Sequence, residues 1–343
     1  MIRETQHLDY LDGWRGISIL FLLAGDFLLW PSIAGHTLHT GRLGVECFFV
    51  LSGRLMAEIL FVRKIPIDVF YWRRASRILP AFWIFIGGMF VASILRPRFQ
   101  VSVLDVVSAL TFTINFRSYE SISGVLAHIW SLCVEEHAYL LLGLVAVIHR
   151  RFTISVLLVL AAVTITCVLN GAVQTFIFDR EYNEVYWRSD VRMASVFMSA
   201  VLYLYLKDIR TIPPMLPIIA GVSGCLLIVW PGVPDPIKYS IGTLSLALAL
   251  VTISCTWSSV SKLLSHPVLI YFGIWSFSLY LWQQPFALIQ RWHSKPLLLI
   301  TLVMVSLTSF YFLEQPARRF LNRHYRPHPR TLSFKLLAAR RSF

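Results

Sequence analysis

The stretch GWRGISILFLLAGDFLLW, residues 13–30, decides what kind of protein this chain is. It has the length and apolar composition of a bilayer-spanning helix, which needs about 20 mostly apolar residues. Yet it carries Asp26, and a charge at such a depth costs a few kcal/mol and is commonly kept for function. Arg15 lies about 16 Å away along a helix, so the two side chains cannot pair directly.

The rest of the chain is as apolar as this segment. Of its 343 residues, 57% are hydrophobic and 14% are charged, whereas a soluble domain carries about 25% charged residues. The composition predicts an all-α polytopic membrane protein with about ten transmembrane helices. The expected spans are 13–30, 42–62, 78–95, 129–149, 153–170, 188–206, 214–231, 239–257, 268–290 and 297–314.

The distribution of Lys and Arg predicts the orientation of these helices. With the N-terminus in the cytoplasm, 20 basic residues fall on the cytoplasmic side and 10 on the outer side, with Arg54 inside a span; cytoplasmic loops are the richer ones. A crossing within the apolar segment 101–127 would invert this asymmetry, so we expect that segment to be re-entrant or non-spanning. The C-terminus is then cytoplasmic as well. We expect one transmembrane domain, 1–320, and a basic cytoplasmic tail, 321–343.

Arginines gather at the cytoplasmic end of the third expected span, in YWRRASRILP, residues 71–80. Arg74 and Arg77 lie three residues apart and share a helical face, with Arg73 beside them. Guanidinium groups bind phosphates bidentately, which suits a phosphorylated cytosolic ligand. An ordinary positively charged flank is the alternative for such a motif taken alone.

Polar residues also enter the fourth span together, in HIWSLCVEEHAYLL, residues 128–141. Ser131, Glu135 and Tyr139 share one helical face, whereas Glu136 points about 100° away from Glu135. A purely structural helix has no need of this density of polar groups, so we expect a functional site here.

The ninth span contains FSLYLWQQPFALI, residues 277–289. Pro285 frees backbone groups and is expected to kink the helix just after Gln283. A broken helix inside a membrane is tolerated where it lines a cavity.

Other polar residues have a structural explanation. Arg54 and Glu58, four residues apart, form a natural ion pair, and Glu46 is assigned to the same structural network. Asp26 itself has the alternative of pairing with a basic residue on another helix. The five cysteines lie in apolar runs without CxxC spacing, so we expect no metal site, and no basic run interleaved with aromatic residues predicts nucleic-acid binding.

These clusters together predict a polar cavity that is reached from the cytoplasm past arginines and closed by polar groups near the outer face. Such a cavity suits the transfer of a group from a cytosolic donor to an outer acceptor. It suits a proton-coupled transporter, with Asp26 and Glu135 as coupling sites, equally well. Transporters usually show internal repeats, and we find none in the sequence.

Six segments, in order, carry a family resemblance: LDGWRGISIL, GRLGVECFFVLSGRLM, WRRASRILPAFW, HIWSLCVEEHAYLL, FSLYLWQQPFALI and FLEQPARRF. Across residues 9–320 the chain resembles the acyltransferase-3 family of bacterial integral-membrane O-acyltransferases. The resemblance implies a ten-helix protein of the bacterial inner membrane. It also implies transfer of an acyl group, most often acetyl, from cytosolic acyl-coenzyme A to a hydroxyl of a glycan or glycosylated small molecule.

The resemblance also implies roles for individual residues. Arg74 and Arg77 match an arginine pair that holds acyl-coenzyme A, with Arg73 beside them and Arg15 at the start of the first-span motif. Glu135 matches a glutamate that lines or organises the active cavity. The residues expected to line the substrate cavity are Trp130, Ser131, Tyr139 and Gln283.

One position departs from the family pattern. The family places a histidine after Arg15 with ten residues between, as the expected general base, and this chain has Asp26 there. An imidazole with a pKa of about 6.5 suits that task, whereas a carboxylate is a poorer base unless burial raises its pKa. Three interpretations stay open: an inactivating substitution, a natural carboxylate base, or a homologue that binds without acylating.

Two other features bear on this base. Some family members carry histidine at the position of Gln283, which cannot shuttle protons. His36 and His39 are loop residues near Asp26 in the sequence, and an imidazole supplied by either is a further alternative.

Overall fold

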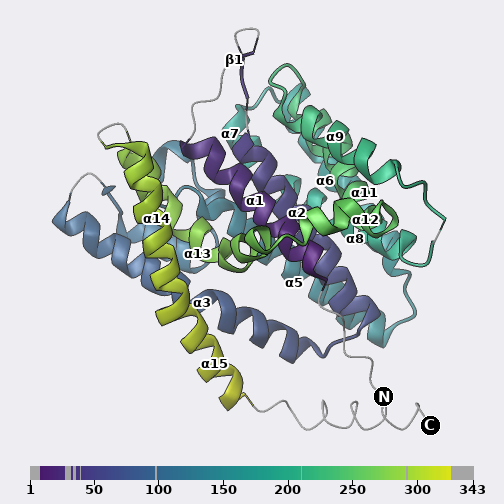
Figure 1. The fold of residues 1–343 in the computed structure, drawn as a ribbon, viewed down its shortest axis with the longest axis horizontal. Helices are drawn as coiled ribbons and strands as arrows, with labels where there is room; N and C mark the ends of the chain where they lie inside the picture. The colour runs from purple at the N-terminus through teal and green to yellow at the C-terminus, as the bar shows by residue number, and fades with distance from the viewer. Residues whose placement is uncertain are drawn as a thin grey trace.

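The computed structural model is a bundle of α-helices of very different lengths (Figure 1). It describes residues 8–27, 32–33, 36–38, 40–96, 99–209, 211–290 and 293–325. Within these residues the only strands, β1 (Ser32–Ile33) and β2 (His36–Thr37), form a two-residue antiparallel hairpin. The longer helices are α1 (Asp9–Phe27), α2 (Thr40–Ala57), α3 (Ile67–Leu95), α5 (Ile129–Arg151), α6 (Val156–Phe176), α8 (Ser189–Leu206), α9 (Leu216–Val229), α11 (Thr243–Thr252), α13 (Pro267–Ile289), α14 (Lys295–Ser309) and α15 (Gln315–His324).

Shorter helical pieces connect or extend these helices. Three π-helical turns continue longer helices directly: η1 (Glu58–Val62), η5 (Lys238–Gly242) and η7 (Phe310–Glu314). The remaining short elements are α4 (Val103–Leu110), η3 (Ile114–Phe116), η4 (Tyr119–Ser121), α7 (Tyr182–Tyr186), α10 (Asp235–Ile237), η6 (Ile253–Cys255) and α12 (Ser258–Leu264).

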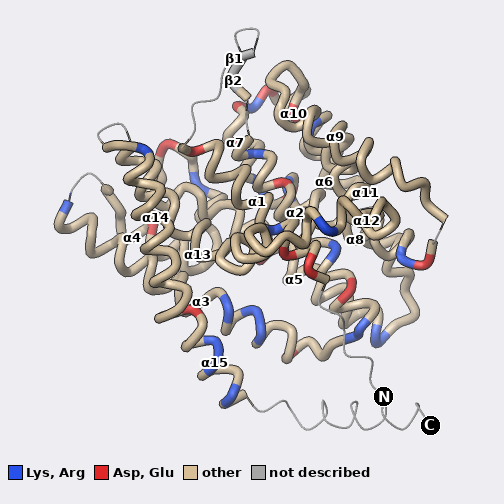
Figure 2. Tube along the Cα trace, in the orientation of Figure 1, with Lys and Arg blue, Asp and Glu red and all other residues tan. Residues whose placement is uncertain are grey.

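In its described residues, every segment expected to span the membrane coincides with a helix. In the described part of the chain, five helices are long and apolar enough to cross a bilayer: Ile67–Leu95, Ile129–Arg151, Val156–Phe176, Asp235–Cys255 and Lys295–His324. The pair α12–α13, bent by 49°, gives a sixth when it is counted as one broken span. The other four expected spans are α1, α2, α8 and α9. Their crossing, the total of ten and the cytoplasmic termini remain predictions. Figure 2 shows that most of the trace is uncharged and that the charged residues form short patches in several places, α3 and α15 among them.

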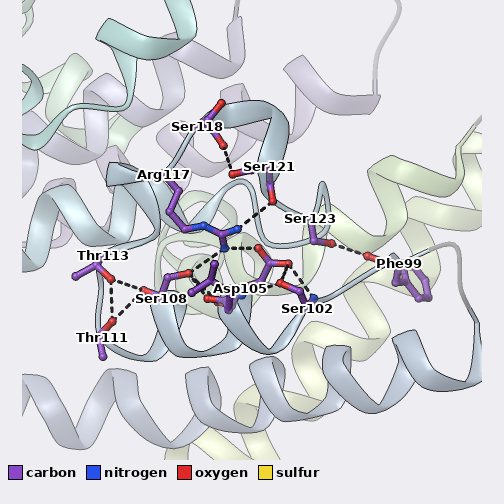
Figure 3. Close-up of polar contacts among 11 residues, drawn as sticks. Phe99, Ser102, Asp105, Ser108, Thr111, Thr113, Arg117, Ser118, Ser121 and Ser123 are labelled. Atoms are coloured by element: carbon purple, nitrogen blue, oxygen red, sulfur yellow. Dashed lines mark hydrogen bonds and ion pairs between the residues drawn. The ribbon is translucent and has the colours of Figure 1, made fainter.

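Segment 101–127 contains no helix longer than the eight residues of α4, which is too short to cross a bilayer. Ser102 and Asp105 form a capping box at the start of α4. Arg117 then folds the segment back, since it donates to the Asp105 carboxylate at 2.6 Å and to the Ser121 carbonyl at 3.1 Å (Figure 3). The described structure thus agrees with the expectation of a non-spanning segment.

Helix α1 lies in the middle of the bundle against α2 and α13 (Figure 1). Small residues let the backbones of α1 and α13 touch. A Cβ atom on Gly16 would lie 2.0 Å from the Leu269 carbonyl oxygen, and one on Gly273 would lie 2.0 Å from that of Asp12. Close approach through glycine is typical of helix packing in membranes, and here it fixes the helix that carries Arg15 and Asp26.

The C-terminal third has a bend that the sequence did not predict. Helices α12 and α13 are bent by 49° at a break before Pro267, and α13 continues through Pro285 to Ile289. The kink at Pro285 and the domain boundary at residue 320 stay predictions, and α15 continues across that position to His324. Residues 326–343 of the expected tail lie outside the described residues.

Candidate functional site

The helices α1, α2, α3, α5 and α13 enclose a cavity of about 230 Å³, which we call the arginine cavity. Three arginines and a carboxylate reach it from three helices. Its polar lining consists of Arg15, Ser52, Arg74, Arg77, Ser131, Glu135, Tyr139, Ser276 and Tyr280, and the rest is apolar.

A second and larger cavity of about 610 Å³ contains Asp26, so we call it the aspartate cavity. Its walls combine aromatic rings with amides and charged groups. The residues that matter below are Asp26, Arg42, Tyr119, His128, Trp130, Ser131, Tyr182, Asn183, Tyr186, Trp187, Tyr280, Gln283 and Gln284.

The two cavities are adjacent, because Leu22, Val45, Ser131 and Tyr280 line both of them. The Ser131 hydroxyl oxygen lies 2.9 Å from that of Tyr280. The Tyr280 hydroxyl also donates to the backbone carbonyl of His128. This hydrogen-bonded pair therefore joins α5 to α13 at the boundary between the cavities.

Arg74 is held by two carboxylates of α5. Its Nε lies 2.8 Å from Glu136, and an Nη atom lies 3.2 Å from Glu135. Glu135 also accepts hydrogen bonds from Ser52 at 2.8 Å and from Tyr139 at 3.3 Å. The Arg74 guanidinium lies 3.5 Å from the centre of the Tyr139 ring, a cation–π contact. Of the two glutamates only Glu135 lines the arginine cavity, as the helical spacing predicted.

The other three arginines differ from Arg74. Arg15 pairs with Asp12 at 2.9 Å. Arg77 lines the arginine cavity and makes no hydrogen bond or ion pair with any residue that the structure describes. Arg73 is exposed and does not line the cavity. The structure therefore brings Arg15, Arg74 and Arg77 together and leaves Arg73 at the periphery.

Asp26 is half-buried and makes no hydrogen bond or ion pair with a described residue. The alternative that it pairs with a basic residue on another helix thus finds no support in this part of the chain. Gln283 is 2% exposed, and its side-chain oxygen has no hydrogen-bond partner within the described ranges. The side chains of His36 and His39 lie outside what the structure describes, so their proposed rescue of Asp26 stays a prediction.

Trp130 belongs to an aromatic wall of the aspartate cavity. Its ring lies 4.6 Å from that of Tyr186, 6.2 Å from that of Trp187 and 6.0 Å from that of Phe49. Rings packed in this way form a rigid apolar surface.

The structure adds residues that the sequence analysis did not single out. Ser52 and Tyr280 both lie inside quoted motifs, but neither carries a charge that would mark it in an apolar helix. Glu136 was expected to face away from the Glu135 side, and it nevertheless reaches Arg74 because the arginine side chain spans the two positions.

The structural ion pairs lie apart from this site. Arg54 and Glu58 pair at 3.0 Å, as predicted. The assignment of Glu46 to the same network is wrong. Glu46 is fully buried and instead accepts hydrogen bonds from Arg192 of α8 and Thr243 of α11. No cluster of His, Cys, Asp and Glu side chains suited to a metal ion occurs among the described residues.

Apolar helices around two adjacent cavities with polar groups in their walls indicate an integral membrane protein. The particular family follows from comparison with known proteins: the chain belongs to the acyltransferase family whose model, described as an acyltransferase domain, matches residues 8–313. The chain is similar to the O-acetyltransferase OatA of Staphylococcus aureus, with 26% identity over 92% of this chain and 58% of that protein.

Two further relatives are named with less certainty of activity. One is YrhL of Bacillus subtilis, a candidate peptidoglycan O-acetyltransferase, with 25% identity over 93% of this chain and 56% of its own length. Another is a candidate O-acetyltransferase, SACOL0978, of Staphylococcus aureus, with 26% identity over 92% of this chain and 58% of that protein. The chain thus spans little more than half the length of these relatives. No solved structure matches it.

Proposed function

We propose that the chain is an O-acyltransferase of the bacterial inner membrane that takes an acyl group, most simply acetyl, from acyl-coenzyme A. The observation that carries this proposal is that two adjacent cavities share Ser131 and Tyr280 in their walls. A transferase with ligands on opposite sides of a membrane needs two sites that meet where the reaction occurs. A cavity with cationic walls suits the phosphorylated donor, and one with aromatic and amide walls suits a sugar acceptor.

The donor enters this scheme from the arginine side. Its phosphates stay at the guanidinium groups near Arg77, where bidentate hydrogen bonds are available. The pantetheine arm extends along the polar face of α5, where Glu135 accepts hydrogen bonds from its amide groups. Arg74 serves as a positioning residue, because both of its carboxylate partners are on α5. The thioester then lies near Ser131.

The acceptor hydroxyl arrives in the aspartate cavity. Asp26 accepts its proton while the hydroxyl oxygen attacks the thioester carbonyl carbon, and the carbon–sulfur bond breaks. The new ester leaves with the acceptor, and the coenzyme A thiolate takes up the proton. A carboxylate that meets no described cation is suited to this step, since an ion pair would lower its basicity.

The aromatic wall around Trp130 supports a glycan acceptor, because sugar rings present C–H faces that pack on aromatic rings. The relative named as a candidate peptidoglycan O-acetyltransferase makes a peptidoglycan strand the first acceptor to test.

The test uses the full chain reconstituted in vesicles with radiolabelled acetyl-coenzyme A and soluble peptidoglycan fragments. We expect ester-linked label on the glycan, which mild alkali removes, and equimolar release of coenzyme A. Vesicles with Asp26→Asn are the matched control and should transfer less by about 100-fold or more, the usual contribution of a general base. Accumulation of an unmodified solute in the vesicles, without thiol release, would identify a transporter instead.

A further inference from the structure

Helix α15 follows the last apolar helix and lies along α3 (Figure 1). Three contacts fix it there. The Ser76 hydroxyl donates to Asn322 at 3.2 Å, the rings of Trp72 and Tyr325 stack at 4.9 Å, and Tyr325 donates to Asp68 at 2.9 Å. The partners on α3 are spaced four residues apart, so they form one stripe along that helix.

These contacts define the register of the two helices. Going backwards along α15 from Tyr325 to Asn322, the partner on α3 advances from Asp68 and Trp72 to Ser76. The helices are therefore antiparallel, and the next turn of α15 lies beside the residues that follow Ser76. Arg318 is four residues before Asn322 and shares its face. The register thus places Arg318 beside the turn of α3 that contains both Arg77 and Pro80.

The charges around Arg318 agree with this placement. Arg318 is close enough to Arg77, Arg73 and Glu314 for their charges to interact, and Arg77 interacts in the same way with Arg15. Figure 2 shows the basic residues of α3 and α15 on the same side of the molecule. Glu314 accepts a hydrogen bond from Ser278 at 2.8 Å, and its carboxylate interacts electrostatically with both Arg77 and Arg318.

The charge balance at this place is positive. Arg74 is neutralised by Glu135 and Glu136, whereas Arg77 and Arg318 make no ion pair with a described residue within salt-bridge distance. Like charges held together repel each other, at a free-energy cost that an anion with several charges removes.

We propose that Arg318 of α15 and Arg77 of α3 together bind the phosphates of a nucleotide that carries more than one phosphate group, and that Arg74 does not. This inference rests on acyl-coenzyme A being the donor, and it assigns the adenosine 3′-phosphate and pyrophosphate to guanidinium groups of two different helices. The family resemblance pairs Arg74 with Arg77, whereas the geometry replaces Arg74 by a residue 244 positions further along the chain.

The experiment measures binding of adenosine 3′,5′-bisphosphate and of coenzyme A to the purified full-length chain in uncharged detergent. We expect Arg77→Ala and Arg318→Ala each to weaken binding by about 10–100-fold, the usual loss of a charge-assisted hydrogen bond. Arg318→Lys should recover part of this loss. Arg323→Ala is the control, because Arg323 is on the same helix but about 140° around it from Arg318. It should change binding by less than about twofold.

Thermal unfolding of each variant shows whether it keeps its fold. Because Arg318→Ala could also detach α15 from α3, Arg318→Glu is compared with Arg323→Glu as a second pair of variants. A larger loss for Arg318→Glu supports the proposal. Equal binding by Arg318→Ala and Arg323→Ala, while Arg77→Ala loses affinity, overturns it and leaves the proposed function intact. Absence of coenzyme A binding by the unchanged protein overturns both.

A lipid phosphate offers the same chemistry, and a second arm separates it from a nucleotide. The same variants are placed in nanodiscs with and without phosphatidylglycerol. An effect of Arg318→Ala on retained anionic lipid, with nucleotide binding unchanged, overturns the proposal. An effect on nucleotide binding at both lipid compositions supports it.

Discussion

Replacement of Glu135 by glutamine tests whether the face of α5 that lines the arginine cavity contacts the acyl donor. Glu135 accepts from Ser52 at 2.8 Å, Tyr139 at 3.3 Å and Arg74 at 3.2 Å. The amide keeps one acceptor oxygen but loses the charge, so the Arg74 contact is weakened while Glu136 still holds that guanidinium at 2.8 Å. One charge-assisted hydrogen bond contributes about 1.5–3 kcal/mol, and we expect a loss of unfolding free energy at the lower end of that range.

The matched control is Glu136→Gln, which removes the other carboxylate from the same guanidinium. We expect a similar loss of stability, measured as the midpoint of unfolding in mixed detergent. Acyl transfer should separate the two variants: Glu135→Gln should lower the transfer rate by about 10–100-fold through the lost contact to the donor. Glu136→Gln, which does not line the cavity, should stay within about threefold of the unchanged protein. Equal losses of activity at equal stability would refute the assignment of Glu135 to the donor path.

Three further perturbations follow from the same structure. Asp26→His should lower acetyl transfer, because we propose the Asp26 carboxylate as the working base; a higher rate would instead identify Asp26 as an inactivating substitution. Tyr280→Phe removes the hydroxyl shared by Ser131 and the His128 carbonyl, so water should reach the thioester more easily. The ratio of free coenzyme A to acylated product should rise, and an unchanged ratio would exclude a sealing role. Glu46→Gln leaves Arg192 buried without its anion and should destabilise the protein by about 3–5 kcal/mol, measured by unfolding; a loss below about 1 kcal/mol would contradict this.

The helices could be predicted from the sequence because each apolar run is long and is bounded by polar residues. The ten expected segments all coincide with helices, with ends that differ by a few residues, except that α3 begins at Ile67, well before the expected start at residue 78. The polar turn that contains Arg73, Arg74 and Arg77 hides this extension, since hydropathy falls there although the backbone stays helical. The distribution of basic residues among the loops, and not the apolar composition of the segment itself, predicted that segment 101–127 does not span the membrane.

The site was predictable in part. The spacing of Ser131, Glu135 and Tyr139 placed these residues on one face, and all three line the arginine cavity. What spacing could not give was the partner of each charge. Arg74 and Arg77 look equivalent in the sequence, yet one is held by two glutamates and the other is not. Which of two neighbouring arginines meets a carboxylate depends on how α5 packs against α3, and no local pattern records this.

Some charges in the apolar helices of this chain form ion pairs, and others line a cavity without one. This difference indicates where a ligand would bind. Glu46 and Arg192 are 0% and 1% exposed, form an ion pair with each other and line neither cavity. A charge kept in a membrane for stability needs such a partner, because its desolvation is otherwise uncompensated. Asp26 and Arg77 have no such partner among the described residues, and each lines a cavity instead. Water or a bound ligand must therefore offset the desolvation of these two charges. A ligand that pairs with Asp26 or Arg77 gains an electrostatic interaction that folding does not already supply.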